Sequence, residues 1–183
     1  VARGMARALG AAGMHARAIK HLQAWLEGHG DDAMAYLLLG DAQHQAGQPE
    51  KAVQTWRRLL EMNPSDVSSY QQVSDRCQAI GQTGPAIEVL MEGRRVLGDD
   101  ALFSWELAAL SLQTGQYERA LEFFFSSIAQ SPNRLSVVEH QLGPLCQRDG
   151  GALLEALLGS TADDPLVKVR LVSTCAQIGR AHV

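Results

Sequence analysis

The sequence lacks a long hydrophobic run and an excess of basic residues. No segment reaches the roughly 18 consecutive apolar residues that a membrane-spanning helix needs. The formal net charge is -4 and the isoelectric point is near 5.8, whereas domains that bind nucleic acids usually carry a basic face. We therefore expect no membrane span within these residues and no nucleic-acid partner.

Cysteine is also scarce, and the chemical motifs of common enzymes are missing. Cys77, Cys146 and Cys175 are the only cysteines, and their spacing fits neither a metal site nor a redox motif, so we expect small buried thiols within helices. The six histidines form no zinc-binding pattern, and Gly81 to Gly84 lacks the lysine of a phosphate-binding loop. We expect no enzyme activity here, with no catalytic residues, no metal and no cofactor.

The sequence does contain a repeat with a step of 34 residues. One series of glycines follows this step, at Gly13, Gly47, Gly81 and Gly115. Two series of small residues follow it as well: Ala18, Ala52, Ala86 and Ala120, and Ala6, Gly40, Ser74 and Ala108. A fixed period of this size indicates stacked helical repeats, each of which packs only against its neighbours.

The stretch 33–66 shows the repeated unit most clearly. Two amphipathic segments flank a turn at Gly47, and Pro64 closes the unit. Gly40 and Ala52 lie where the two helices should cross, because a larger side chain there would separate the helix axes. Overpacking of this kind typically costs about 1–3 kcal/mol.

This unit resembles the tetratricopeptide repeat. The residues that carry the resemblance are Tyr36, Leu39, Gly40, Ala52, Trp56 and Pro64, and in a later unit Leu107, Ala108, Ala120, Phe124 and Pro132. The resemblance covers residues 1–134 well and the remainder loosely. It implies an all-α fold, namely a right-handed superhelical solenoid of about five antiparallel helix pairs.

We expect a single helical-repeat domain over residues 1–177. The predicted units are 1–32, 33–66, 67–100 and 101–134, followed by a degenerate unit at 135–165 and the start of a sixth at 166–177. Acidic residues precede three of the opening helices and can cap their first turns; they are Asp31, Asp32, Asp66, Asp99 and Asp100.

Two stretches depart from the regular pattern. Three consecutive phenylalanines, Phe123 to Phe125, cannot share one narrow helix face, so one of them should face a neighbouring repeat or the surface. After Leu135 the register slips, since Pro144 falls inside a predicted helix, where it would kink that helix. Gly150 and Gly151 replace the single turn glycine.

Both ends of the chain read as incomplete repeats, so we expect a longer parent protein. The chain begins at Val1 inside a first helix, without Met, and stops before the second helix of a sixth unit. Residues 178–183, with the sequence IGRAHV, look like a translated sequencing adapter, which predicts a non-native tail. The alternative is that residues 178–180 belong to the turn of a sixth repeat.

In proteins that this chain resembles, the first helix of each pair lines a concave groove that binds a partner. Carried over by position, the candidate peptide-binding residues are Leu37, Asp41, His44, Gln45, Gln71, Asp75, Gln78, Leu102, Trp105, Ala109, Leu112 and Gln113. Asp41 and Asp75 would repel a carboxylate, which argues against the members that hold a C-terminal carboxylate. Trp105 is either a peptide anchor or packs against the next helix.

The predicted function is a non-catalytic protein–protein interaction scaffold that binds a peptide or protein segment in this groove. Two alternatives stay open from the sequence. The chain is the repeat region of a larger multidomain enzyme, such as a transferase, or it is a structural or self-association module.

Overall fold

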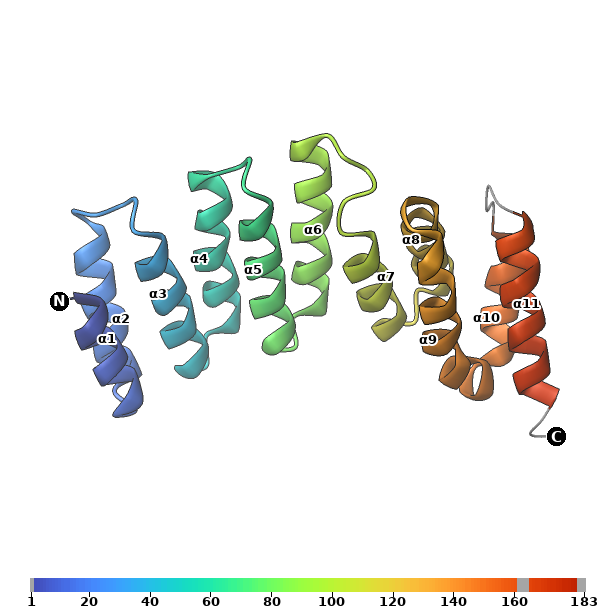
Figure 1. Cartoon of the computed structure of the whole chain (residues 1–183). Coiled ribbons are helices and arrows are strands. Elements are labelled where there is room, and N and C mark those ends of the chain that lie inside the picture. Colours follow the sequence, from blue (N-terminus) through green and yellow to red (C-terminus); the bar gives the residue numbers. More distant parts are fainter. Residues whose placement is uncertain (1, 161–164, 181–183) are drawn as a thin grey trace. The chain divides into compact units, whose positions relative to one another are not determined.

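The computed structural model describes residues 2–160 and 165–180, and its regular elements there are all helical (Figure 1). The predicted all-α helical-repeat class is therefore confirmed. The chain divides into two compact units, unit 1 up to Gly98 and unit 2 from Asp99. Within the described residues, no helix is both long enough and apolar enough to cross a membrane.

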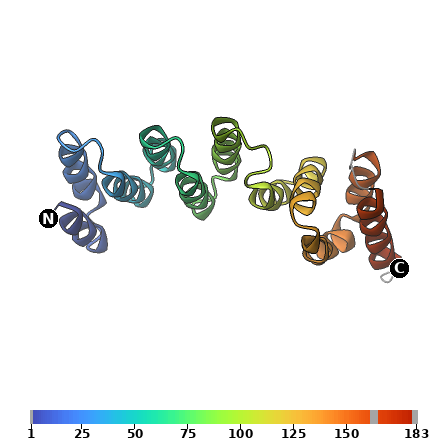
Figure 2. The same cartoon turned by 45° about the horizontal axis from the view of Figure 1, so that its top comes forward.

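Unit 1 consists of three helix pairs in chain order. Its helices are α1 (Ala2–Ala11), α2 (His15–Leu26), α3 (Ala33–Gln45), α4 (Pro49–Met62), α5 (Val67–Ala79) and α6 (Thr83–Leu97). Figure 2 looks nearly along these helices and shows two layers, which we call the first-helix layer (α1, α3, α5) and the second-helix layer (α2, α4, α6). The core lies between the layers and includes Leu22, Trp56, Tyr70 and Leu90.

The glycine series forms the turns within helix pairs. Gly13, Gly47, Gly81 and Gly115 have backbone φ angles of 70°, 74°, 74° and 71°. Glycine enters this left-handed region without the steric penalty of a Cβ atom, and it is the usual residue directly after a helix. The 34-residue step therefore reflects one turn conformation repeated four times.

The small residues lie at the helix crossings, as predicted. Gly40 on α3 faces the indole ring of Trp56 on α4, and a Cβ atom on Gly40 would overlap that ring. The Trp56 Nε1 donates a hydrogen bond to the Leu37 carbonyl at 3.3 Å, which fixes the ring in place. Ala52 is fully buried on the same helix as Trp56.

Two of the predicted acidic caps are confirmed. The Asp32 carboxylate accepts a hydrogen bond from the Ala35 backbone N–H at 3.0 Å. Asp66 accepts from the backbone N–H groups of Ser68 and Ser69. Each carboxylate therefore pairs with donors that the first helical turn leaves unsatisfied.

The helix expected to begin at Asp99–Asp100 starts later than its pattern predicts. Asp99 accepts from the Ala101 N–H at 2.8 Å, but helix α7 begins only at Ser104. Phe103 precedes it with a φ angle of 56°, a conformation that costs a non-glycine residue about 1 kcal/mol or more. The chain therefore makes an extra turn before α7.

Unit 2 is less regular than unit 1. Its helices are α7 (Ser104–Gln113), α8 (Tyr117–Gln130), the short 3-10 helix η1 (Pro132–Arg134), α9 (Leu135–Arg148), α10 (Gly150–Gly159) and α11 (Pro165–Arg180). Helix α9 continues through Pro144, and only Asp149 separates it from α10. Consequently, α10 packs against α8, α9 and α11.

The predicted unit boundaries and the superhelical twist stay predictions. The degenerate unit 135–165 includes residues 161–164, which lie outside the described residues. Of the predicted tail 178–183, residues 178–180 form the end of α11, and residues 181–183 lie outside the described part of the chain.

Candidate functional site

The predicted groove residues of unit 1 lie on α3 and α5. Six of them reach the surface fully or in part, and we call these the polar row: Asp41, His44, Gln45, Gln71, Asp75 and Gln78. Leu37 is only 6% exposed, because it faces the core of its helix pair. The row therefore contains acidic, amide and imidazole groups but no large apolar side chain.

An ion pair joins the two helices of the polar row. Arg76 on α5 donates a hydrogen bond to the Asp41 carboxylate on α3. The Arg76 guanidinium also lies over the Trp56 ring, 5.9 Å from its centroid, where a cation is attracted to the aromatic face. Asp75, in contrast, is exposed and has no ion pair within residues 2–160 and 165–180.

A cavity of about 310 Å³ lies between α1 and α3. Its wall is formed by Ala6, Arg7, Gly10, His15, Leu38, Asp41, Ala42 and Gln45. The structure thus brings Asp41 and Gln45 together at one hollow that Arg7 also lines. The groove assignment from the sequence missed Arg7, although Arg7 precedes Asp41 by one 34-residue step.

Asp32 connects the first three helices. Its carboxylate accepts hydrogen bonds from Arg3 Nε on α1 and Trp25 Nε1 on α2, both at 2.9 Å, and from the Ala35 N–H on α3. Burial opposes ionisation of Asp32, but these bonds favour the charged form, and the net effect lowers its pKa. Asp32 therefore supports the helices that form the α1–α3 cavity.

The predicted groove residues of unit 2 are less accessible. Leu102, Trp105, Ala109 and Leu112 are half-buried, and Gln113 is exposed. The Trp105 ring makes an edge contact with Phe124 on α8, with centroids 5.6 Å apart and planes at 67°. The Arg134 guanidinium lies over the Trp105 ring, 5.9 Å from its centroid, so Trp105 has packing partners within its own unit.

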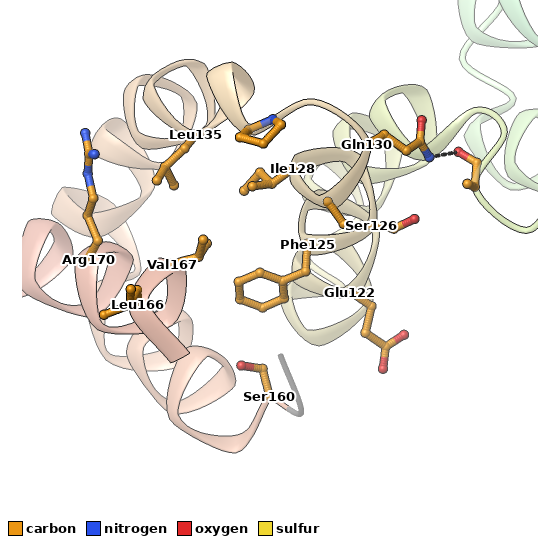
Figure 3. Close-up of a pocket in the computed structure, with 13 residues that line it drawn as sticks. Glu122, Phe125, Ser126, Ile128, Gln130, Leu135, Ser160, Leu166, Val167 and Arg170 are labelled. Atoms are coloured by element: carbon orange, nitrogen blue, oxygen red, sulfur yellow. Dashed lines mark hydrogen bonds between the residues drawn. The ribbon is translucent and has the colours of Figure 1, made fainter. Parts of the chain in front are cut away.

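A larger cavity, of about 1020 Å³, lies between α8 and α11, and none of the predicted groove residues lines it. Figure 3 shows Phe125, Ile128, Leu135, Leu166 and Val167 around its centre. Phe123 and Phe124 are buried, whereas Phe125 is only partly so. The third phenylalanine is therefore the one that faces a hollow.

Most charged groups around this cavity have partners. Arg170 donates two hydrogen bonds to the Glu139 carboxylate, at 2.6 and 2.8 Å. Lys168 donates to the backbone carbonyls of Leu158 and Ser160. Glu122 lies at the cavity edge (Figure 3), is exposed, and has no ion pair among the residues that the structure describes.

The cysteines are buried, as predicted. Burial raises the pKa of the Cys77 thiol to about 11. Burial also raises the pKa of Cys146 to about 12, and the neighbouring Cys175 thiol adds to this shift. The Cys77 and Cys146 thiols therefore favour the protonated form near neutral pH, which is the less nucleophilic form.

Comparison with known proteins agrees with the repeat assignment. Residues 9–77 match the family model described as Tetratricopeptide repeat. Tetratricopeptide repeat protein 21B of Xenopus laevis is 28% identical over 96 residues, which are 52% of this chain and 7% of that protein. The chain thus spans only a small part of this relative's length.

Solved structures of the protein MamA have a similar fold. One, titled Crystal structure of MamA protein, has a TM-score of 0.51 at 15% identity and covers 98% of this chain and 90% of that chain. A second, MamA AMB-1, has a TM-score of 0.50 at 14% identity, with coverage of 98% and 88%. Identities this low show a common fold only. The match at residues 9–77 and the all-helical architecture together support a tetratricopeptide-repeat protein.

Proposed function

We propose that the chain binds a peptide or protein segment on the first-helix layer of unit 1 and catalyses no reaction. The tetratricopeptide-repeat fold is in general a scaffold for protein–protein interaction and is typically non-catalytic. Stacked helix pairs can present side chains from successive repeats to consecutive parts of one ligand. The proposal assigns this role to the polar row and to Arg7.

The observation that carries the proposal is the α1–α3 cavity. It places Arg7, Asp41 and Gln45 at one hollow, so a guest there meets a cation, a carboxylate and an amide. Asp41 is already paired with Arg76, whereas Arg7 is exposed and has no ion pair among the residues described. We infer a guest segment that offers a hydrogen-bond acceptor to Arg7.

Unit 2 has predicted groove residues of its own. Of these, Trp105 and Leu112 are half-buried on α7 and would offer apolar contact area to a segment bound on that helix. Aromatic residues of this kind often dominate binding energy where they become fully desolvated.

Peptides selected from a displayed random library against the chain would test the proposal by fluorescence polarisation. Gln45→Arg fills the α1–α3 cavity with a second guanidinium beside Arg7, and we expect it to weaken binding about tenfold. Gln23→Arg is the matched control, because Gln23 is exposed on α2, away from this cavity. Equal affinities of the two variants would contradict the proposed site.

A further inference from the structure

The α8–α11 cavity of unit 2 is a second candidate for binding, and its chemistry differs from that of the polar row. At about 1020 Å³, it is at the upper end of the volumes usual for ligand sites. Its central side chains, Phe125, Ile128, Leu135, Leu166 and Val167, are all apolar (Figure 3). We propose that it binds one amphipathic helix of a partner protein, with aliphatic anchors flanked by lysine or arginine.

The spacing of the wall residues favours a helical guest. On α8, Phe125, Ile128 and Ala129 follow the i, i+3, i+4 pattern of one helix face. Leu166 and Val167 on α11 form the opposite wall. Two facing helices with apolar side chains between them form the kind of groove into which an amphipathic helix places its apolar side.

One wall residue is exposed to an unusual degree. Leu166 is 79% exposed at the start of α11, although large apolar side chains usually lie inside. A bound apolar helix would cover this side chain together with the partly buried Phe125. Both residues would then gain the burial that favours association.

The negative charge of unit 2 favours basic residues on both sides of the apolar face of the guest helix. Of the residues that line the cavity, Glu122 and Arg170 are charged, and Arg170 already pairs with Glu139. The nearby Lys168 donates to backbone carbonyls, so Glu122 is the lining carboxylate that has no ion pair within the described residues. On a larger scale, residues 1–98 contain ten acidic and ten basic residues, and residues 99–183 contain ten acidic and six basic. The whole net charge of -4 thus belongs to unit 2, so basic flanks are attracted and acidic flanks repelled.

A pair of designed peptides tests this proposal. The first is a fluorescein-labelled amphipathic helix with leucines at i, i+3, i+4 and i+7 and lysines on its flanks, and the second carries glutamates in place of the lysines. We expect the lysine peptide to bind about tenfold more tightly, with a gap that narrows at high salt. Equal binding of the two peptides, or binding of neither, would overturn the proposal.

Matched variants locate the site. Leu166→Glu places a charge on the apolar wall and should weaken binding of the lysine peptide about tenfold or more. Val169→Glu is its control, since Val169 is 63% exposed on the same helix and does not line the cavity. Likewise, Glu122→Lys should favour the glutamate peptide, whereas Glu118→Lys, one turn earlier on α8, should not.

Two other results would also overturn the assignment of a helical guest. If sedimentation shows a dimer that Leu166→Glu dissociates, the cavity wall is an interface between copies of this chain. If Nile red binds in a Leu166-dependent manner while neither peptide competes with it, the cavity takes a small apolar molecule instead. The proposal concerns α8 and α11 and does not depend on the polar row, so Gln45→Arg should leave binding of the lysine peptide unchanged.

Discussion

Unit 1 and unit 2 are built from similar helix pairs but differ in how the pairs are joined. In unit 1, each pair turns at a left-handed glycine, and Asp32 and Asp66 cap the helices that follow. In unit 2, the pair α7–α8 turns at Gly115 in the same way, whereas α9 and α10 are separated by Asp149 alone and neither has a side-chain cap. The regular joints keep the helices of unit 1 in closely packed layers.

The consequence is visible in the cavities. The hollow between α1 and α3 measures about 310 Å³ and includes charged side chains, while that between α8 and α11 measures about 1020 Å³ and is mainly apolar. Loss of the repeat pattern after Leu135 thus coincides with a larger apolar hollow. A single all-helical chain can therefore carry one hollow with charged side chains and another that is mainly apolar.

The largest expected effect concerns Trp105, whose counterpart one step earlier is Gln71. Trp105→Ala removes the edge contact with Phe124 and the contact with Arg134, and we expect it to lower the free energy of unfolding by about 3 kcal/mol. Gln71→Ala, at an exposed position, should change it by less than about 0.5 kcal/mol. Urea denaturation followed by circular dichroism measures both. A small loss for Trp105→Ala, combined with weaker partner binding, would instead make Trp105 a surface anchor.

Gly40 tests the close packing of unit 1. Gly40→Ala should lower the free energy of unfolding by about 2 kcal/mol, because the new methyl group overlaps the Trp56 ring. Gly151→Ala on α10 is the comparison in unit 2, where the added Cβ atom meets nothing within 4 Å. That variant should be neutral or gain up to about 1 kcal/mol from helix propensity. Equal effects in the two units would refute the packing difference.

Asp32 gives unit 1 a dependence on acid pH. Because its pKa is lowered in the fold, its contribution to stability is complete above the ordinary aspartate pKa of about 4 and disappears as pH falls through the folded value. Asp32→Asn should therefore cost about 1 kcal/mol at neutral pH and nothing in strong acid. Asp100→Asn is the control in unit 2 and should cost less, since Asp100 is exposed and its side chain has no ion pair within the described residues. A constant difference between wild type and Asp32→Asn at all pH values would contradict this prediction.

The smallest effect is expected for the thiols. The raised pKa values of Cys77 and Cys146 predict that Ellman's reagent reacts with the native chain at pH 8 at least about tenfold more slowly than with the unfolded chain. In the Cys77→Ser variant, the reagent can label only the two thiols of unit 2, Cys146 and Cys175. Rapid labelling of the native variant would show that α9 and α11 open more readily than unit 1 does.

Much of the fold was predictable from the sequence because its determinants are local and repeat. A left-handed turn needs glycine at one position, and a helix crossing needs a small side chain at another, so the recurrence of Gly47 and Ala52 at a step of 34 residues reveals the repeat. Asp32 and Asp66 were likewise identified as caps from their place before a helix. The start of α7 was not, because the turn through Phe103 obeys no pattern that the other repeats share.

The candidate sites depended on the tertiary structure. The spacing of helix residues shows which side chains share a face, but not how far apart two helices lie that are distant in the chain. For this reason the sequence placed Asp41 and Gln45 on one surface, yet it did not reveal that Arg3 and Trp25 donate hydrogen bonds to Asp32, nor did it reveal the cavity between α8 and α11. The repeat step, the turns and the crossings were set by the sequence through local sterics, whereas the depth and polarity of each hollow were decided by packing between helices.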